Sequence, residues 1–188
     1  MKFYITLFIT LITLTFFSCE NLDNSVSLTE NEEIISSNTT IPTIISTENG
    51  FEILQLINGT KGGSITFDTV YVDKEGDSIL IQTNLTFLPN SFTGVKEIKI
   101  IPDFYTGEVI FLPEMIFDKP AFLNLSYTGI DLVRLGFDSN SKVDFVYCTD
   151  DGAVELIAKK ECKIKWDSKE MYVKNAKLQH FSRYVFVR

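Results

Sequence analysis

The side chains that could carry out acid–base, nucleophilic or metal chemistry are few in this sequence. His180 is the one histidine among 188 residues, and the three cysteines are Cys19, Cys148 and Cys162. Structural zinc sites need clustered Cys and His ligands, and Cys148 and Cys162 lack a C-x-x-C spacing. The sequence also contains no Walker loop, no dinucleotide-binding glycine pattern and no G-x-S-x-G motif. We therefore predict no metal, no cofactor and no conventional small-molecule active site.

Three alternate carboxylates, Asp73, Glu75 and Asp77, resemble the start of a calcium-binding loop. The glycine and the closing glutamate that an EF-hand loop requires are absent. Lys74-Glu75-Gly76-Asp77 also has the composition of a turn between strands. We interpret these acids as a solvated hairpin turn, and we interpret Asp150-Asp151-Gly152 in the same way.

The charge balance excludes some classes of partner. The chain has 17 Lys and Arg against 25 Asp and Glu, a formal charge of −8. Removal of residues 1–18 would take away Lys2 and make this balance −9. An acidic surface repels phosphate backbones and anionic lipid headgroups, so we predict no nucleic-acid partner.

Hydrophobic periodicity from about residue 51 onward is that of strands. Apolar and polar side chains alternate with a period of two over residues 78–88, 121–127 and 143–147. Residues 64–72 and 78–88 form a predicted hairpin around the Lys74–Asp77 turn. We count about ten short strands, residues 172–178 and 181–187 among them as two separate strands, with one short helix over residues 51–57 as an open alternative. The predicted fold class is all-β, an antiparallel sandwich or barrel.

Cys148 and Cys162 lie on either side of the Asp151-Gly152 turn, on strands predicted to be successive. Antiparallel register across this turn places Cys148 opposite a residue close to Glu155 and not opposite Cys162. Direct disulfide pairing of the two cysteines within this hairpin is therefore disfavoured. We therefore predict two free, buried thiols.

The N-terminal segment has the features of an export signal. After Lys2, residues 3–17 are apolar or Thr, which is shorter than the roughly 20 residues of a membrane-spanning helix. Ser18-Cys19 then resembles the lipobox of bacterial lipoproteins. The resemblance implies that Cys19 receives a diacylglyceryl group, that residues 1–18 are removed, and that the lipid anchors the chain. The alternatives are an ordinary signal peptide with an incidental cysteine, or a short signal anchor.

Residues 19–50 are predicted to be a lipidated flexible tether. Ser, Thr, Asn and Glu dominate this segment, and it contains no aromatic residue. Such a composition buries too little apolar surface to offset the entropy of ordering. The alternative is that its last part, around IPTIIST, forms a first strand of the domain. Glu20, where Asp would signal inner-membrane retention in enteric bacteria, favours the outer membrane of a Gram-negative cell.

The domain predicted over residues 51–188 carries motifs that resemble a known family. The motifs are Gly62-Gly63-Ser64-Ile65-Thr66, Phe117-Asp118-Lys119-Pro120-Ala121-Phe122-Leu123, Asp151-Gly152 and His180-Phe181-Ser182-Arg183-Tyr184. Their order resembles the ZU (ZU-five) domain of zonula occludens proteins, netrin receptors, ankyrins and the death-domain protein PIDD, and resembles its bacterial relatives more closely. The resemblance covers about residues 62–188. It implies a β-sandwich that serves as an interaction module and not as a small-molecule enzyme.

The same resemblance points to one possible reaction. In PIDD and in a self-cleaving nucleoporin, H-F-S is a site of autoproteolysis. Carried onto this chain, His180 takes the proton of Ser182, and the Ser182 oxygen attacks the preceding carbonyl, so that an ester replaces the Phe181–Ser182 bond and is then hydrolysed. Such cleavage requires a strained peptide. The alternative is that H-F-S-R-Y is simply the closing strand.

The function that these observations favour is that of a lipid-anchored lipoprotein of the cell envelope. Its non-enzymatic β-sandwich would bind another envelope protein or a surface polymer. Two alternatives remain: a self-processing domain cut at Phe181–Ser182, and a purely structural accessory domain of a larger envelope complex.

Overall fold

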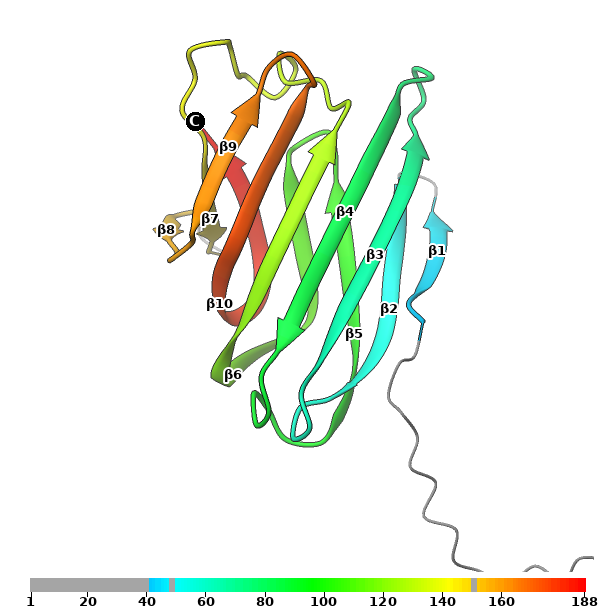
Figure 1. Cartoon of the computed structure of the whole chain (residues 1–188), viewed down its shortest axis with the longest axis vertical. Helices are drawn as coiled ribbons and strands as arrows, with labels where there is room; N and C mark the ends of the chain where they lie inside the picture. Colours follow the sequence, from blue (N-terminus) through cyan, green and yellow to red (C-terminus); the bar gives the residue numbers. More distant parts are fainter. Residues whose placement is uncertain (1–40, 48–49, 150–151) are drawn as a thin grey trace, which may run out of the picture. The chain divides into compact units, whose positions relative to one another are not determined.

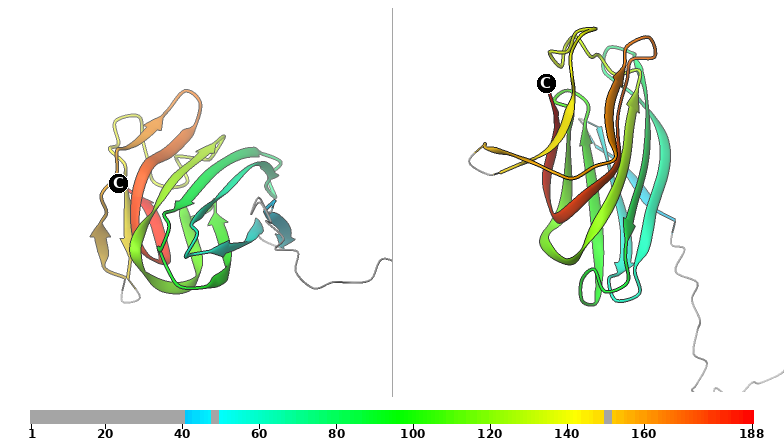
Figure 2. Two further views of the ribbon diagram at one scale, coloured as in Figure 1. Left: turned by 60° about the horizontal axis from the view of Figure 1, so that its bottom comes forward. Right: turned by 60° about the vertical axis from the view of Figure 1, so that its left-hand side comes forward.

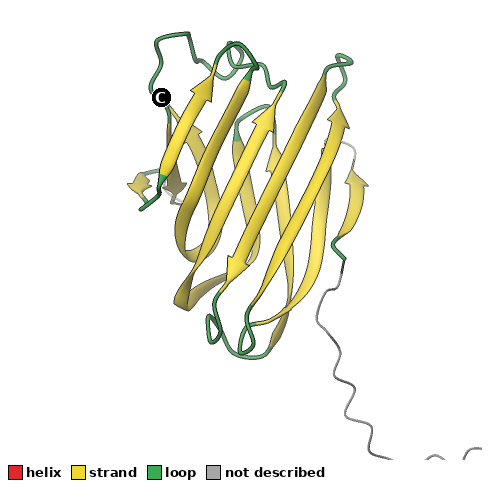
Figure 3. Ribbon diagram, in the orientation of Figure 1, coloured by secondary structure: helices red, strands yellow, loops and turns green. Residues whose placement is uncertain are grey.

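The computed structural model describes residues 41–47, 50–149 and 152–188. Every regular element in these ranges is a β-strand, so the predicted all-β class is confirmed (Figure 3). The strands are β1 (Thr43–Thr47), β2 (Gly50–Asn58), β3 (Gly63–Val72), β4 (Ser78–Phe87), β5 (Val95–Asp103), β6 (Glu108–Thr128), β7 (Asp144–Cys148), β8 (Val154–Leu156), β9 (Glu161–Lys165) and β10 (Glu170–Val187).

Two long strands carry one antiparallel sheet through two layers (Figures 1 and 2). β6 pairs with β5 through residues 108–112 and with β4 through residues 122–128. β10 behaves likewise, since residues 170–174 pair with β9 and residues 183–187 pair with β7. The front layer in Figure 1 therefore has the order β3-β4-β6-β10-β9, and the back layer has the order β1-β2-β5-β6-β10-β7-β8.

The inward-facing side chains of the two layers form one apolar core. In β4, Ile79, Ile81 and Leu85 are buried while Gln82 between them is exposed. This is the period of two that the sequence predicted for residues 78–88, and β6 repeats it with Leu123, Leu125 and Tyr127 of its predicted 121–127 segment. Burial of alternate apolar residues thus fixes which face of each front strand is exposed to solvent.

The predicted first hairpin is confirmed. β3 and β4 pair without a break from Gly63 opposite Phe87 to Val72 opposite Ser78. In the turn, Asp73 Oδ1 accepts hydrogen bonds from the backbone N–H groups of Glu75 at 3.0 Å and Asp77 at 2.9 Å. Asp73 therefore shapes the turn through a side-chain oxygen, as acidic residues commonly do.

The structure corrects two local predictions at the start of the domain. Residues 51–57 form most of strand β2 and not a helix, because Phe51, Ile53 and Ile57 alternate into the core. Residues 43–47 form β1, which pairs antiparallel with β2, so the alternative of a first strand around IPTIIST is confirmed. All five β1 residues are exposed, and so composition alone gave little sign of the strand.

The C-terminal half has fewer and longer strands than predicted. The segments 172–178 and 181–187 belong to one strand, β10, because irregularities in its pairing with β6 bend it without ending it. β8 lies between the two cysteine-bearing strands, which are therefore not successive. Cys148 pairs with Val154 and Cys162 pairs with Val173, so the predicted separation of the thiols is confirmed.

Candidate functional site

The outer side of the front layer presents polar side chains, all but one of them uncharged, in register across three strands. We call this set the polar face and define it as Thr66, Asp68, Gln82, Asn84, Asn124 and Ser126. Backbone pairing aligns Asp68 with Gln82 and Gln82 with Ser126 in one row. A second row consists of Thr66, Asn84 and Asn124. A hollow of about 300 Å³ lies over the two rows, and Tyr172 and Lys174 of β10 line its far side.

Hydrogen bonds orient the amide at the centre of the polar face. Asn84 Nδ2 donates to Thr66 Oγ1 at 2.7 Å, and Thr86 Oγ1 donates to Asn84 Oδ1 at 3.0 Å. Gln82 Nε2 donates a longer bond of 3.4 Å to Asp68 Oδ2. Cross-strand polar pairs of this kind stabilise a sheet and hold side chains in defined rotamers.

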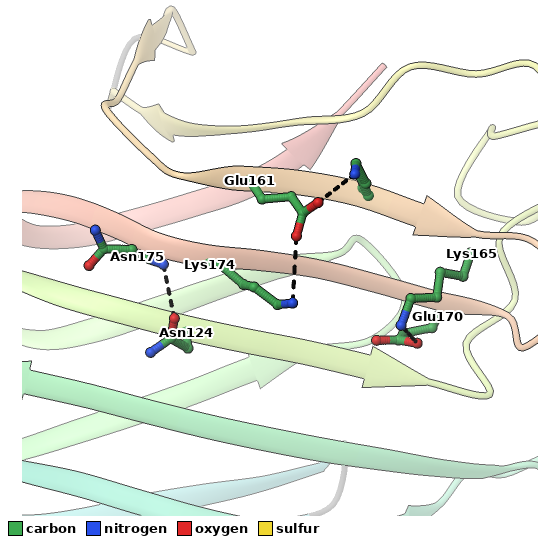
Figure 4. Close-up of polar contacts among 7 residues, drawn as sticks. Asn124, Glu161, Lys165, Glu170, Lys174 and Asn175 are labelled. Carbon is green, nitrogen blue, oxygen red and sulfur yellow. Dashed lines mark hydrogen bonds and ion pairs between the residues drawn. The ribbon is translucent and has the colours of Figure 1, made fainter.

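A bulge in β10 fixes the neighbouring amide of Asn124 (Figure 4). Asn175 has a left-handed φ of 52° and lies where the pairing register between Val173 and Ala176 shifts. Its backbone N–H donates to Asn124 Oδ1 at 2.9 Å. Asn tolerates this backbone region better than most residues. The bond occupies the Asn124 oxygen and leaves the two N–H donors of Nδ2 for other partners.

Paired charges border the polar face on the β9 side (Figure 4). Lys165 Nζ lies 2.8 Å from Glu170 Oε2, Lys174 Nζ lies 3.5 Å from Glu161 Oε2, and Lys163 pairs with the other Glu161 oxygen. The hydrogen bond from Lys163 holds the pKa of Glu161 below its ordinary value. Each of these three cations is thus paired with one of two carboxylates.

Tyr172 closes the row beyond Ser126, and it is buried although it faces outward. Its backbone pairs with Ser126 on one side and with Lys163 on the other. The ammonium groups of Lys165 and Lys174 lie 5.1 and 4.9 Å from the centre of its ring. The cation–π contacts keep the ring covered, leaving it 5% exposed.

His180 lies where β10 passes from the front layer to the back layer. Its ring packs edge to face on Tyr147 of β7, with the centroids 4.3 Å apart. Its backbone carbonyl accepts a hydrogen bond of 2.7 Å from the Tyr184 hydroxyl. Burial raises the pKa of Tyr184 well above its ordinary value, so Tyr184 remains a neutral donor.

The structure brings His180 and Ser182 to one pocket of about 390 Å³, which Met115 and Ile116 of β6 also line. Ser182 is 9% exposed. The hydrogen bonds of the described residues include none between Ser182 Oγ and the His180 imidazole. Neither Phe181 nor Ser182 has a left-handed φ. The two residues are neighbours in a pocket without the base-to-nucleophile bond that activates a serine, and cleavage of Phe181–Ser182 stays a prediction.

The acidic turn forms the one group of candidate metal ligands among the described residues. One ligand atom from each of Asp73, Glu75 and Asp77 lies within 4.8 Å of the others. Asp73 Oδ1 is already engaged by two backbone N–H groups of the turn. The geometry is therefore that of a capped turn.

Cys148 and Cys162 are both free and partly buried. Arg183 Nη2 lies 3.2 Å from Cys148 Sγ and donates a hydrogen bond to it. Burial, helped by the nearby carboxylate of Asp144, raises the pKa of Cys162 to about 12. A thiol with this pKa is a weak nucleophile at neutral pH.

The lipidation candidate Cys19 and the predicted leader, residues 1–18, lie outside the described residues. The described residues contain no helix that is long and apolar enough to cross a membrane. Comparison with known proteins gives no further guide, because no family model, curated protein or solved structure matches the chain.

The polar face was not predicted as a site from the sequence. Its members come from the β3–β4 hairpin and from β6, which is separated from that hairpin in the chain by β5, and only the pairing register aligns them. One signal was present. At the outward positions of these strands, the six residues that became the polar face are all polar, and none is Lys or Arg.

Proposed function

We propose that this protein is a lipid-anchored component of a Gram-negative cell envelope and that its β-domain is a non-enzymatic binding module. The anchor is Cys19, and the outer membrane is favoured over the inner one by Glu20. A tether then carries the domain, whose first described strand begins at Thr43. The ligand is an envelope protein or a surface polymer.

The observation that carries the binding role is the polar face. Solvated sheet surfaces usually mix charged side chains, whereas Thr66, Gln82, Asn84, Asn124 and Ser126 are uncharged. They line a hollow, and three of their amide and hydroxyl groups are held by cross-strand or bulge hydrogen bonds. Prearranged donors and acceptors over a concavity are typical of ligand sites.

We also propose that the domain is a β-sandwich of the ZU type. It is supported by where the family-like motifs lie. Phe117-Asp118-Lys119-Pro120 occupies the middle of β6, and His180-Phe181-Ser182 occupies the middle of β10. His180 is paired directly with Ile116, so the two motifs are adjacent at the bends that join the layers.

Site-specific photo-crosslinking in intact cells tests the binding role. A photoreactive residue replaces Asn124 on the polar face, or Glu97 as a control. Glu97 is exposed on the outer side of β5 in the back layer. We expect one discrete adduct from position 124 and none from position 97. Equal adducts at both positions, or none at position 124, would contradict a ligand site on the polar face.

Self-processing is the second candidate function. The observation that favours it is that His180 and Ser182 line one pocket beside an irregularity of β10 between Phe181 and Arg183. Bulges can re-aim side chains next to reactive sites. The intact mass of the purified protein decides between this function and the first, because self-processing would shorten the chain by residues 182–188.

A further inference from the structure

We infer that the polar face binds an uncharged polysaccharide chain. This inference rests on the proposed binding function and names the class of its ligand. It follows from the chemistry, the charge and the extent of the polar face.

The hydrogen-bonding groups of the polar face match those of sugar hydroxyls. A hydroxyl both donates and accepts, and the amides of Gln82 and Asn124 and the hydroxyl of Ser126 offer both kinds of group. Several of these groups have no hydrogen-bond partner among the described residues. The free groups are the Ser126 hydroxyl, the Asn124 Nδ2 donors and the Gln82 carbonyl oxygen.

The charge distribution selects a neutral ligand. Asp68 is the one charged member of the polar face. The cations that border the two rows on the β9 side, Lys165 and Lys174, are held by Glu170 and Glu161. An anionic polymer would therefore meet Asp68 and a chain of net charge −8, while Lys165 and Lys174 are already paired with carboxylates.

The composition of the polar face argues against a protein partner. The centres of protein interfaces are enriched in aromatic and apolar side chains. On the front layer, the large exposed apolar side chains lie outside the two rows: Val70 and Val72 at one end of β3, Leu88 after β4, and Trp166 after β9. The rows between them contain only amide, hydroxyl and carboxylate side chains. A ligand rich in hydroxyl groups satisfies such a surface better than an apolar anchor would.

The extent of the site indicates a chain and not a single sugar. One row runs from Asp68 on β3 through Gln82 and Ser126 to Tyr172 on β10. Neighbouring strands lie about 4.8 Å apart, so this row extends over roughly 14 Å. That length exceeds one pyranose ring. Because the Tyr172 ring is covered, binding depends on hydrogen bonds, and we expect modest affinity per domain.

Affinity gel electrophoresis of the full-length protein tests this inference, in a detergent without a sugar headgroup. The probes are neutral polysaccharides (a β-glucan, a xylan, a mannan and a galactan) and two anionic ones (alginate and polygalacturonate). We expect at least one neutral probe to retard the protein, with little change between low and high salt. An ionic contact would weaken with salt.

Three variants locate the binding. The double variant Gln82→Ala/Ser126→Ala removes exposed groups that have at most one weak internal bond, so the fold should persist. It should bind the retarding probe about tenfold more weakly, whereas Glu97→Ala should bind as the wild type does. Asn124→Ala should also weaken binding, and circular dichroism confirms that each variant is folded.

The outcomes separate this inference from the proposed function. Retardation by the anionic probes alone, by no neutral probe, or equally in the double variant would overturn the polysaccharide inference. A protein adduct at position 124 together with no retardation would also overturn it while leaving the proposed binding function standing. No adduct and no retardation would overturn both.

Discussion

The rings of Phe117 and Phe181 meet edge to face, with their centroids 4.8 Å apart. Phe117 lies in the bend of β6 and Phe181 in the bend of β10, so the contact lies where both strands change layers. Phe181 also stacks on Phe111 at 5.1 Å and meets Phe87 of the front layer at 5.8 Å. Edge-to-face aromatic pairs stabilise a folded domain by more than the burial of their apolar area alone would.

Truncation at this contact should be costly. We expect Phe117→Ala to lower the free energy of unfolding by about 3–5 kcal/mol, because it leaves a cavity among closely packed rings. The neighbouring Ile116 is 85% exposed, and Ile116→Ala should change stability by less than about 0.5 kcal/mol. Urea unfolding of both variants, followed by circular dichroism, measures the difference. Equal losses would show that the bend is not held by this aromatic cluster.

Replacement of Asn175, the left-handed residue of the β10 bulge, should cost stability when the new side chain is β-branched but not when it is glycine. At the φ of 52° found for Asn175, Asn175→Val should destabilise the domain by about 1–2 kcal/mol. Asn175→Gly adopts this φ freely and keeps the N–H that bonds Asn124, so we expect little change. Thermal unfolding of the two variants provides the comparison. A valine variant as stable as the glycine variant would contradict the assigned backbone.

The two domain cysteines should behave as free thiols of low reactivity. In the unfolded, unreduced protein, both Cys148 and Cys162 should react with a thiol reagent. In the folded Cys148→Ser variant, the raised pKa of Cys162 leaves roughly one thiolate in ten thousand at pH 8. Alkylation should therefore be slow there and about tenfold faster for each pH unit gained below pH 12. A rate that levels off below pH 9, or a lack of thiols after unfolding, would refute this.

The intact mass of the purified protein should show an uncut C-terminus. Ser182 Oγ has no hydrogen bond to His180, so most molecules should remain whole. Cleavage would release residues 182–188, but their pairing with β7 would retain the piece in a native gel. Denaturing mass spectrometry is therefore the measurement. A mass shortened by residues 182–188 that returns to full length in both Ser182→Ala and His180→Ala would establish self-processing.

Lipidation of Cys19 should determine where the protein fractionates. The apolar leader ending in Ser18-Cys19 predicts labelling by a fatty-acid analogue and recovery with membranes. Cys19→Ala should abolish the label and release the protein from the membrane fraction. Cys162→Ser serves as the matched control and should keep both properties. Equal labelling of wild type and Cys19→Ala would remove the basis for the lipid anchor.

The sequence predicted strands wherever burial alternates with exposure. Ile79, Ile81 and Leu85 defined β4, because one side of that strand faces the core. β1 gave no such signal, since its side chains are all exposed and its pairing depends on the neighbouring strand. The unbroken lengths of β6 and β10 were also missed. A strand that crosses between layers changes which face is buried at its bend, and this interrupts the periodicity on which the prediction depends.

Of the two candidate sites, the pocket of His180 and Ser182 was predictable from the sequence and the polar face was not. His180 and Ser182 were predicted together because they are two residues apart in the chain, and one pocket does contain both. The polar face required knowledge of register, because a shift of one residue between β4 and β6 would turn Asn124 away from Asn84. No pattern within a single strand encodes that alignment.

The attachment of β1 through a single neighbouring strand has a mechanical consequence for a domain held by its N-terminal end. Tension applied before Thr43 reaches β1 first, and β1 is attached to the domain only by five paired residues of β2. Because β1 buries no side chain, it is the segment that should detach at the lowest force. The polar face lies on β3, β4 and β6, none of which pairs with β1. The domain could therefore lose its first strand under tension while the strands that would hold a bound polymer stay paired.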